Sequence, residues 1–400
     1  MFARILDLHL PLGQSAFLWG PRKVGKSTYL RGRFPDSLWL DLLDSDLRFA
    51  LARRPAQLRE IIQAAPAMQL QLPIVVDEVQ KVPELLDEVH WLVENRRLSF
   101  VLCGSSARKL KRGKANLLGG RAWRYEMFPL VSAEVPNLDL GRALAQGLVP
   151  SHYESQHADR SIAAFVHDYL KEEIAADALT RNLAAFARFL DAAGIMNGEM
   201  VNYAKMAAEV GVDAKSVKGY FQILEDTLLG RFLESMPSKP GSRRNLVATS
   251  KFYLFDPGVA GALRGATVLG LKGPEAGHLF ETFIANELFA YLSYRQRRIP
   301  IHFYRTKAGA EIDFVLNHGA VAIEAKLSNH VRGADLRALN GFLDGSPQCR
   351  AIVVSLESRS RVVEPRDGLL RSTHGGSFAG CCGPARLFDF VDALKWCIQE

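Results

Sequence analysis

The sequence is poor in cysteine and has no long apolar run, and each scarcity excludes a class of protein. Its 400 residues include five cysteines, none of them in a C-x-x-C pair, so neither a disulfide framework nor a thiolate zinc site is expected. No apolar run approaches the roughly 20 residues that a membrane helix needs. The first residues, MFARILDLHLPLG, contain no cleavable apolar segment. We therefore expect a cytoplasmic protein with no membrane partner.

Charge of one sign is also not in large excess. The chain has 50 Lys and Arg against 43 Asp and Glu, which gives a formal net charge of +7. This balance is compatible with binding a polyanion, but many basic proteins bind none. Hydrophobic residues make up 48% of the chain, enough to form the cores of two or three domains.

A glycine-rich segment follows a short apolar strand near the start. Ser15–Trp19 reads as a buried strand, and the residues after Thr28 read as a helix. Between them lies the pattern G-x-x-x-x-G-K-S, whose backbone N–H groups wrap phosphates. Lys26 is expected to reach the β- and γ-phosphates of ATP, and the Ser27 hydroxyl to ligate Mg²⁺. The predicted nucleotide-binding residues are Gly20, Pro21, Arg22, Lys23, Val24, Gly25, Lys26, Ser27 and Thr28.

Two acids end the next strongly apolar run. Leu72–Glu78 reads as a strand buried on both faces, as in a parallel sheet. The C-terminal ends of such strands are where open α/β sheets bind ligands. Asp77 is placed to hold the Mg²⁺, and Glu78 to orient and activate the attacking water.

Hydroxyls and one arginine complete the predicted ATP site. Ser105, or its neighbour Ser106, follows the strand predicted at Leu98–Cys103 and could contact the γ-phosphate or the water. Arg121 follows a Gly-Gly turn and could reach the ATP of a neighbouring subunit. A local salt bridge explains Arg121 equally well.

The segments GPRKVGKST, VVDEVQKVPELL, VLCGSSARKL, LLGGRA and MFPLVSAE resemble a divergent branch of the AAA+ ATPases. These are bacterial and archaeal ATP-binding proteins whose C-terminal half resembles a PD-(D/E)xK nuclease domain. The resemblance spans nearly the whole chain. It implies a homo-oligomer and a winged-helix-like region after the ATPase core.

The middle of the chain contains a helix, a turn at Gly211 and a second amphipathic helix. Helix-turn-helix units have this form. If the unit reads DNA, the second helix would place Lys215, Ser216 and Lys218 in the major groove. If it only packs, it would be a lid on the ATPase.

A hairpin in the last third carries the second set of candidate residues. Strict alternation marks Glu311–Asn317 and Ala320–Lys326 as strands around a His318-Gly319 turn. This turn sets Asp313 opposite Glu324. We expect Ile312 and Phe314 to share one face of the hairpin. Two carboxylates side by side repel each other, and a bound Mg²⁺ would relieve the repulsion.

The set Asp313, Glu324 and Lys326, with Glu281 on the preceding helix, resembles the PD-(D/E)xK nuclease core. The resemblance implies that Asp313 and Glu324 bind Mg²⁺ or Mn²⁺, that Lys326 assists the attacking water, and that Glu281 completes the site. A solvent-facing strand pair balanced by Lys326, or a nuclease fold that binds DNA without cutting it, would also fit.

These observations predict an α/β protein in three parts. The parts are a P-loop AAA+ type parallel sheet (1–147), a helical and winged-helix-like middle (148–268), and an α/β restriction-endonuclease-like domain (269–400). The leading hypothesis is a Mg²⁺-dependent ATPase coupled to DNA binding and metal-dependent cleavage. The alternatives are an ATP-switched regulator that binds DNA or a protein through an inactive nuclease fold, and a transcription regulator that uses the helix-turn-helix.

Overall fold

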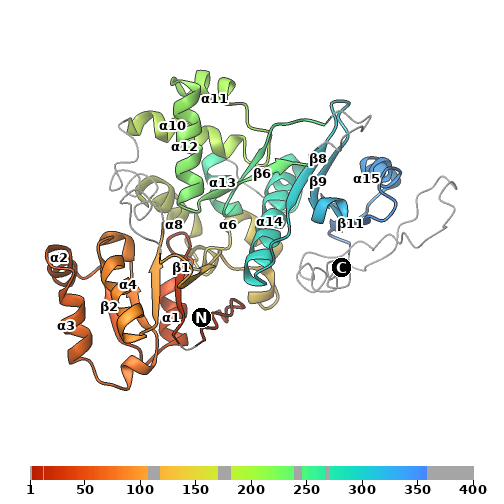
Figure 1. Cartoon of the computed structure of the whole chain (residues 1–400). Helices are drawn as coiled ribbons and strands as arrows, with labels where there is room; N and C mark the ends of the chain where they lie inside the picture. Colours follow the sequence, from red (N-terminus) through yellow and green to blue (C-terminus); the bar gives the residue numbers. More distant parts are fainter. Residues whose placement is uncertain are drawn as a thin grey trace. The chain divides into compact units, whose positions relative to one another are not determined.

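The computed structural model describes residues 2–11, 13–106, 118–169, 182–237, 246–265 and 270–357. These residues form two compact units (Figure 1). The first comprises residues 3–129 together with 222–229, and the second comprises 130–221 together with the described residues between 230 and 357. The three domain boundaries drawn from the sequence stay a prediction, and residues 358–400 of the third part lie outside the described residues.

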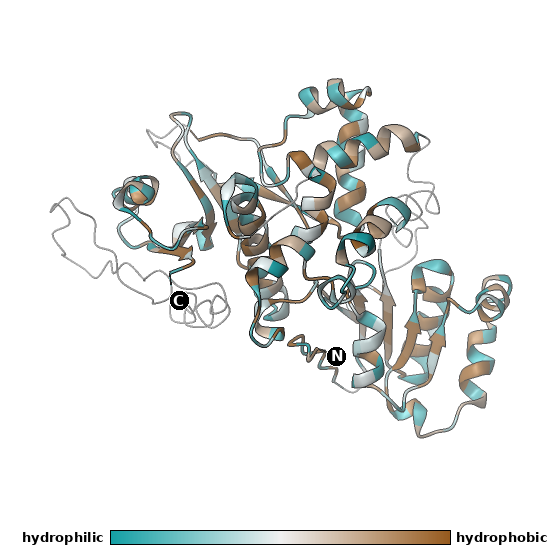
Figure 2. Ribbon diagram, turned by 180° about the vertical axis from the view of Figure 1, so that it is seen from behind, coloured by the Kyte–Doolittle hydropathy of each residue, from teal (hydrophilic) through white to brown (hydrophobic). Residues whose placement is uncertain are grey.

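The first unit is built on a five-stranded parallel sheet in the order β2-β3-β4-β1-β5. Its strands β1, β3 and β4 are buried at every position, because both faces of a parallel sheet are covered. In Figure 2 these strands are correspondingly brown. The strands are β1 (Ser15–Trp19), β2 (Trp39–Asp41), β3 (Ile74–Asp77), β4 (Phe100–Gly104) and β5 (Ala122–Glu126).

Helices connect these strands. The order β1-α1-β2 and β3-α4-β4 is the alternation that a parallel sheet requires. Asp44 caps α2, because its side chain accepts from the backbone N–H of Asp46 and Leu47. The helices are α1 (Lys26–Arg33), α2 (Ser45–Arg53), α3 (Gln57–Ala64) and α4 (Leu85–Arg96).

The second unit begins with helices packed around α13 (Pro257–Arg264), which contacts α6, α8, α10 and α14. Small residues allow this close packing. A Cβ on Gly258 would lie 2.4 Å from the backbone of Gln146, and a Cβ on Gly194 would lie 2.5 Å from Leu263. The helices are α6 (Leu140–Gln146), α7 (Pro150–Tyr153), α8 (Ala158–Ala164), a π-helical turn at Phe165–Tyr169, and α10 (Leu183–Ile195).

The predicted helix-turn-helix pair is present as α11 (Tyr203–Val210) and α12 (Ala214–Asp226). Gly211 ends α11 in the left-handed conformation at φ 74°, which glycine adopts without steric strain. The last residues of α12 belong to the first compact unit.

The second unit also contains a mixed six-stranded sheet in the order β11-β10-β9-β8-β6-β7. Helix α14 (Gly273–Tyr294) packs on β10 and β7, and α15 (Arg337–Leu343) packs on β9. The strands are β6 (Gly230–Ser235), β7 (Lys251–Leu254), β8 (Ile301–Arg305), β9 (Glu311–Leu316), β10 (Val321–Lys326) and β11 (Arg350–Ser355). The mixed α/β class, with a helical middle and a second α/β sheet, agrees with the class predicted from the sequence.

The β9–β10 hairpin has the predicted register, since Leu316 pairs with Val321 and Phe314 with Ile323. The expected face of Ile312 was wrong. Ile312 packs in one apolar cluster with Val315, whereas Phe314 packs against Tyr253 at 6.0 Å between ring centroids. The physical reason is an irregularity in the β8–β9 pairing between His302 and Tyr304, which interrupts the alternation of faces.

No helix in the described part of the chain is both long and apolar enough to cross a membrane.

Candidate functional site

The glycine-rich loop leads from β1 into α1, as predicted. Gly25 adopts φ 93°, a left-handed conformation, and α1 begins at Lys26 directly after it. Lys26 is only 6% exposed, and its Nζ donates to the carbonyl oxygens of Gly20 and Pro21, each at 2.8 Å. The lysine therefore closes the loop on itself through neutral acceptors that an anionic ligand can replace.

The loop fits closely against its surroundings. A Cβ on Gly20 would lie 2.4 Å from the carbonyl oxygen of Met127, so only glycine fits there. On the other side, Arg4 donates to the carbonyl oxygens of Val24 and Phe128, each at 2.7 Å. Arg4 was not among the predicted residues, because nothing in a lone N-terminal arginine indicates such a long-range contact. Of the other predicted loop residues, Arg22 is half-buried, and Lys23 and Thr28 are exposed.

The two proposed Mg²⁺ ligands of this site lie in contact. The hydroxyl of Ser27 donates to Asp77 Oδ2 at 2.6 Å, and Asp77 is 2% exposed at the end of β3. A hydroxyl and a carboxylate are oxygen donors, which suit a hard cation. The donor set and the glycine cradle therefore both fit a Mg²⁺-bound nucleotide.

Glu78 directly follows β3, and its backbone leaves the extended conformation of the strand. Its backbone is left-handed, with φ 57°, which is uncommon for a residue other than glycine and directs the chain into the 3-10 turn at Val79–Lys81. Its carboxylate accepts a hydrogen bond from Gln80 Nε2 at 2.5 Å. The same amide nitrogen donates to Ser105 Oγ at 3.1 Å. Gln80 was missed, although it lies in the VVDEVQK segment, because no spacing rule singles out a glutamine.

Ser106 and Arg121 have other partners within the first unit. The Ser106 hydroxyl donates to the carbonyl oxygen of Asp226 at 3.1 Å. Arg121 forms an ion pair with Glu94 and donates to the carbonyl oxygen of Gly119 at 3.2 Å. The local salt bridge considered for Arg121 is therefore present, and its role toward a neighbouring subunit stays a prediction.

The predicted acids of the second unit also lie near one another. Asp313 Oδ2 accepts from the backbone N–H of Ala325 at 2.8 Å, which brings Asp313 to the strand that carries Glu324. Both acids are more than 90% buried. Burial, with the charges of Glu281 and Glu324, holds the pKa of Asp313 well above its usual value. Lys326 pairs with Glu324 at 2.6 Å.

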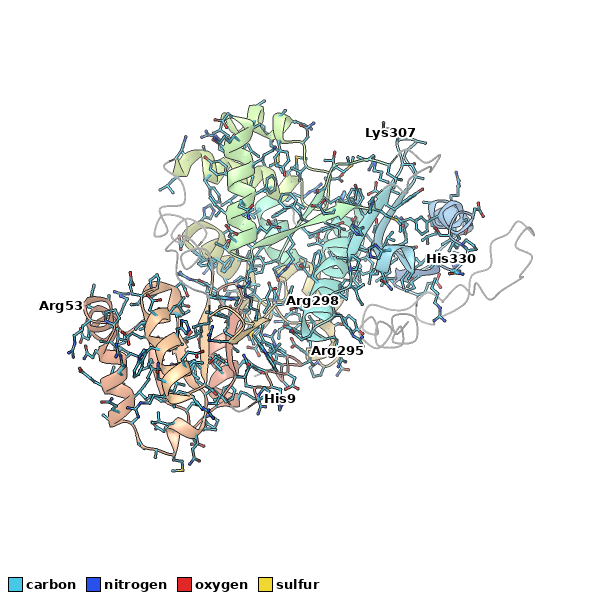
Figure 3. The ribbon with its side chains drawn as sticks, in the orientation of Figure 1. His9, Arg53, Arg295, Arg298, Lys307 and His330 are labelled. Carbon is cyan, nitrogen blue, oxygen red and sulfur yellow. The ribbon has the colours of Figure 1, made fainter. Side chains whose placement is uncertain are left out.

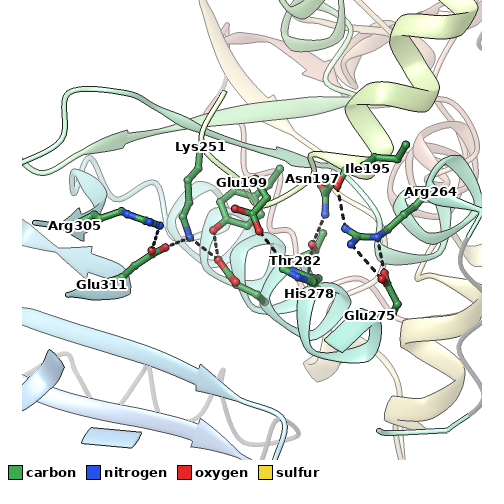
Figure 4. A network of polar contacts seen from close by, with 12 residues as sticks. Ile195, Asn197, Glu199, Lys251, Arg264, Glu275, His278, Thr282, Arg305 and Glu311 are labelled. Carbon is green, nitrogen blue, oxygen red and sulfur yellow. Dashed lines mark hydrogen bonds and ion pairs between the residues drawn. The ribbon is translucent and has the colours of Figure 1, made fainter. Parts of the chain in front are cut away.

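Glu281 lies beside Lys251, which was not predicted to contribute. Figure 4 shows Lys251 beside Glu311, which in turn faces Arg305. Lys251 is 3% exposed, and its Nζ lies 2.9 Å from a Glu281 oxygen and 2.7 Å from a Glu311 oxygen. The hydroxyl of Tyr253 donates to Glu281 at 2.5 Å, and Arg305 pairs with Glu311. The segment KFYLFD supplies both Lys251 and Tyr253.

The expected metal set is only partly assembled. In the described ranges, no three His, Cys, Asp or Glu side chains are grouped so that they could hold a metal ion. Glu281 is held by Lys251 and Tyr253, and one oxygen of Glu324 by Lys326. The other oxygen, Glu324 Oε2, is buried and has no hydrogen-bond partner in this part of the structure. Two carboxylates, Asp313 and Glu324, are thus the oxygen donors that a hard cation would find here.

The helix-turn-helix residues are at the surface. Lys215 and Lys218 are exposed, and Lys218 Nζ lies 5.2 Å from the ring centre of Tyr203. The backbone N–H of Ser216 donates to Asp213 at 2.7 Å, which caps the start of α12.

The first unit places a G-x-x-x-x-G-K-S loop between a parallel strand and a helix, which is similar to P-loop ATPase domains of the AAA type. Residues 13–135 match the family model described as an AAA domain. Residues 137–271 match a domain of unknown function (DUF8612), and residues 276–366 match a second one (DUF4143). No curated protein matches the chain.

Proposed function

We propose that the chain hydrolyses ATP at the P-loop. The observation that carries this proposal is the 2.6 Å contact between Ser27 and Asp77 beside a closed loop, next to Lys26. Mg²⁺, when bound there, would neutralise phosphate charge. The match of residues 13–135 to an AAA domain supports the same activity.

Each residue then has a defined task. Lys26 exchanges the carbonyl oxygens of Gly20 and Pro21 for phosphate oxygens. Ser27 and Asp77 hold the cation, and Glu78 accepts the proton of the attacking water. Ser105 is linked to Glu78 through Gln80, whose side-chain amide donates a hydrogen bond to the Ser105 hydroxyl.

Two variants test this assignment. Lys26→Ala should weaken ATP binding by about 100-fold or more, because the phosphate charge loses its partner, while Glu78→Gln should bind ATP normally and lose turnover by about 100-fold. The measurements are fluorescent-nucleotide titration and phosphate release, with the exposed Gln63→Met as a control. Equal turnover in Glu78→Gln and wild type would reject the role of Glu78.

We propose as a second candidate that the second unit cleaves DNA with Mg²⁺ or Mn²⁺. One observation favours it. Glu324 Oε2 is buried and has no hydrogen-bond partner among the described residues, and Glu324 lies on β10, the strand whose Ala325 N–H donates to Asp313. Asp313 and Glu324 would hold the metal, Lys326 would assist the attacking water, and Glu281 would complete the site. Exposed basic residues of this unit, including Arg295, Arg298, Lys307 and His330 (Figure 3), would suit a phosphate backbone.

A cleavage screen separates the second candidate from a regulator that binds without cutting. Linear, nicked, branched and single-stranded DNA would be incubated with the full chain, with and without ATP. Asp313→Asn, Glu324→Gln and Lys326→Ala should each abolish cleavage and leave ATP hydrolysis within about twofold. The exposed Glu209→Gln is the matched control. No cleavage by wild type in Mg²⁺ or Mn²⁺ would favour the regulator. Binding without cleavage that depends on Lys215 and Lys218 would favour the helix-turn-helix reading.

The resemblance to AAA+ proteins also supports a homo-oligomer, for which light scattering with and without ATP is the direct measurement.

A further inference from the structure

The amide of Gln80 joins two residues of the proposed ATP site. Its Nε2 donates to Glu78 at 2.5 Å and to Ser105 at 3.1 Å, while its Oε1 is buried without a hydrogen-bond partner among the described residues. Gln80 itself is 5% exposed and lies in the short 3-10 turn that follows β3. Because the Gln80 side chain is buried and has little freedom to move, its amide can keep the Glu78 carboxylate and the Ser105 hydroxyl in one relative position.

Gly104 provides the space for this amide. A Cβ built on Gly104 would lie 2.2 Å from Gln80 Oε1 and 2.7 Å from the ring of Trp19. Gly104 does not have a positive φ. The close approach of the Gln80 amide therefore gives a reason for glycine at the end of β4, directly before Ser105.

We infer that Gln80 is a positioning residue for ATP hydrolysis, which fixes the carboxylate of Glu78 relative to Ser105. This inference rests on the proposed ATPase function. The geometry matters because a general base must lie within hydrogen-bond reach of the proton that it abstracts, and a displacement of about 1 Å can reduce the rate about 100-fold.

Substitutions of Gln80 and of Lys26 should change different quantities, turnover in the first case and ATP binding in the second. Gln80 has no contact with the glycine-rich loop among its hydrogen bonds in the described residues. Loss of its amide should therefore affect turnover much more than nucleotide binding. Loss of Lys26 should affect binding first.

The test uses Gln80→Met in the full chain, since methionine keeps the length of the side chain and removes both donors. We expect kcat to fall at least about tenfold while the Kd for ATP stays within about threefold. Gln63→Met, on the exposed surface of α3, is the control for the same substitution and should match wild type. Gly104→Ala should also lower kcat, because the added methyl displaces the Gln80 amide. Its melting temperature is measured as well, since the same methyl would press on the ring of Trp19.

A double-mutant cycle separates positioning from a general packing role. If Gln80 acts through Glu78, Gln80→Met should reduce turnover no further once Glu78→Gln is present. Additive losses, or a wild-type kcat in Gln80→Met, would overturn the inference. A parallel fall in kcat, ATP affinity and melting temperature would overturn it also, because that pattern indicates packing. Glu78→Gln with wild-type turnover would reject the role of Glu78 and overturn the inference, whereas a wild-type chain that hydrolyses no ATP would remove the proposed function itself.

Discussion

Two buried lysines serve different kinds of partner in the two units. Lys26 in the first unit donates to the carbonyl oxygens of Gly20 and Pro21. Lys251 in the second unit contacts the carboxylates of Glu281 and Glu311. Both side chains are almost fully buried, at 6% and 3% exposed.

The partners decide what each lysine can do. Carbonyl oxygens are neutral, so an anionic phosphate can compete with them for Lys26. Carboxylates are charged, and removing one partner of a buried ion pair leaves a charge with no compensation. Lys26 can therefore bind a ligand, whereas Lys251 is held in its ion pairs and stabilises the fold.

The sharpest test of this comparison is the stability of two matched variants. Lys251→Met should lower the free energy of unfolding by about 3–5 kcal/mol, because Glu281 and Glu311 lose their shared cation. Lys26→Met should lower it by less, about 1–2 kcal/mol, since its lost hydrogen bonds have neutral acceptors and no carboxylate is left without a cation. Urea unfolding without ATP measures both. Similar losses in the two variants would end the distinction.

Stabilisation by bound ATP should depend on Lys26 and not on a lysine of the second unit. ATP with Mg²⁺ at about 100 times its Kd should stabilise wild type by about 2.7 kcal/mol through binding to the folded state. Lys26→Met should lose most of this gain at the same concentration. Lys326→Met, in the second unit, is the control and should keep it. A full gain in Lys26→Met would show that the loop lysine does not bind the nucleotide.

The second unit should also show a pH dependence that the P-loop does not explain. Glu287 is 2% exposed and accepts from the Ser132 N–H and hydroxyl at 2.7 and 2.8 Å. Burial, and then the charge of Glu134, raises its pKa to about 8. An acid with a raised folded pKa binds its proton more tightly in the folded state, so stability falls as the pH rises from about 4.5 to about 8.

Glu287→Gln should remove the part of the slope that Glu287 contributes, which a shift of this size sets at up to about 5 kcal/mol across the window. Urea midpoints between pH 5 and pH 9 measure it. Asp191→Asn, on the exposed face of α10, should leave the slope unchanged. An identical slope in Glu287→Gln would assign the titration to another group.

The smallest effect is expected at the exposed pair Arg121–Glu94, with side chains 40% and 48% exposed. Exposed ion pairs contribute little, so neither Arg121→Ala nor Glu94→Gln should change the melting temperature measurably. If Arg121 reaches the ATP of a neighbouring subunit, Arg121→Ala alone should lower ATPase. Mixing it with Lys26→Ala subunits should then restore part of the activity. Mixtures that never exceed their parents at any ratio would leave only the local pair.

Local patterns in the sequence predicted much of this structure. The spacing from Gly20 to Ser27 fixed the loop because its chemistry is contained in one short segment. The β9–β10 register followed from one two-residue turn. The face of Ile312 did not follow, because it depends on an irregularity in the pairing with another strand, β8.

Partners from distant segments were not predictable in the same way. Lys251 lies far along the chain from Glu311, and Arg4 far from Phe128, and no periodicity connects either pair. Gln80 is close to Glu78 in sequence, yet its importance appears only when β4 brings Ser105 beside it.

The end of α12 bears on how the nucleotide unit can be isolated. Residues 222–229 belong to this unit, although the AAA match stops at residue 135. Leu228 packs against the unit's apolar core, and the Asp226 carbonyl accepts from Ser106. A fragment cut at residue 135 would keep all five strands but expose the apolar surface that Leu228 covers. It should be less soluble than the same fragment fused to residues 214–229, and equal solubility of the two would show that this helix end is dispensable for an independently folding piece.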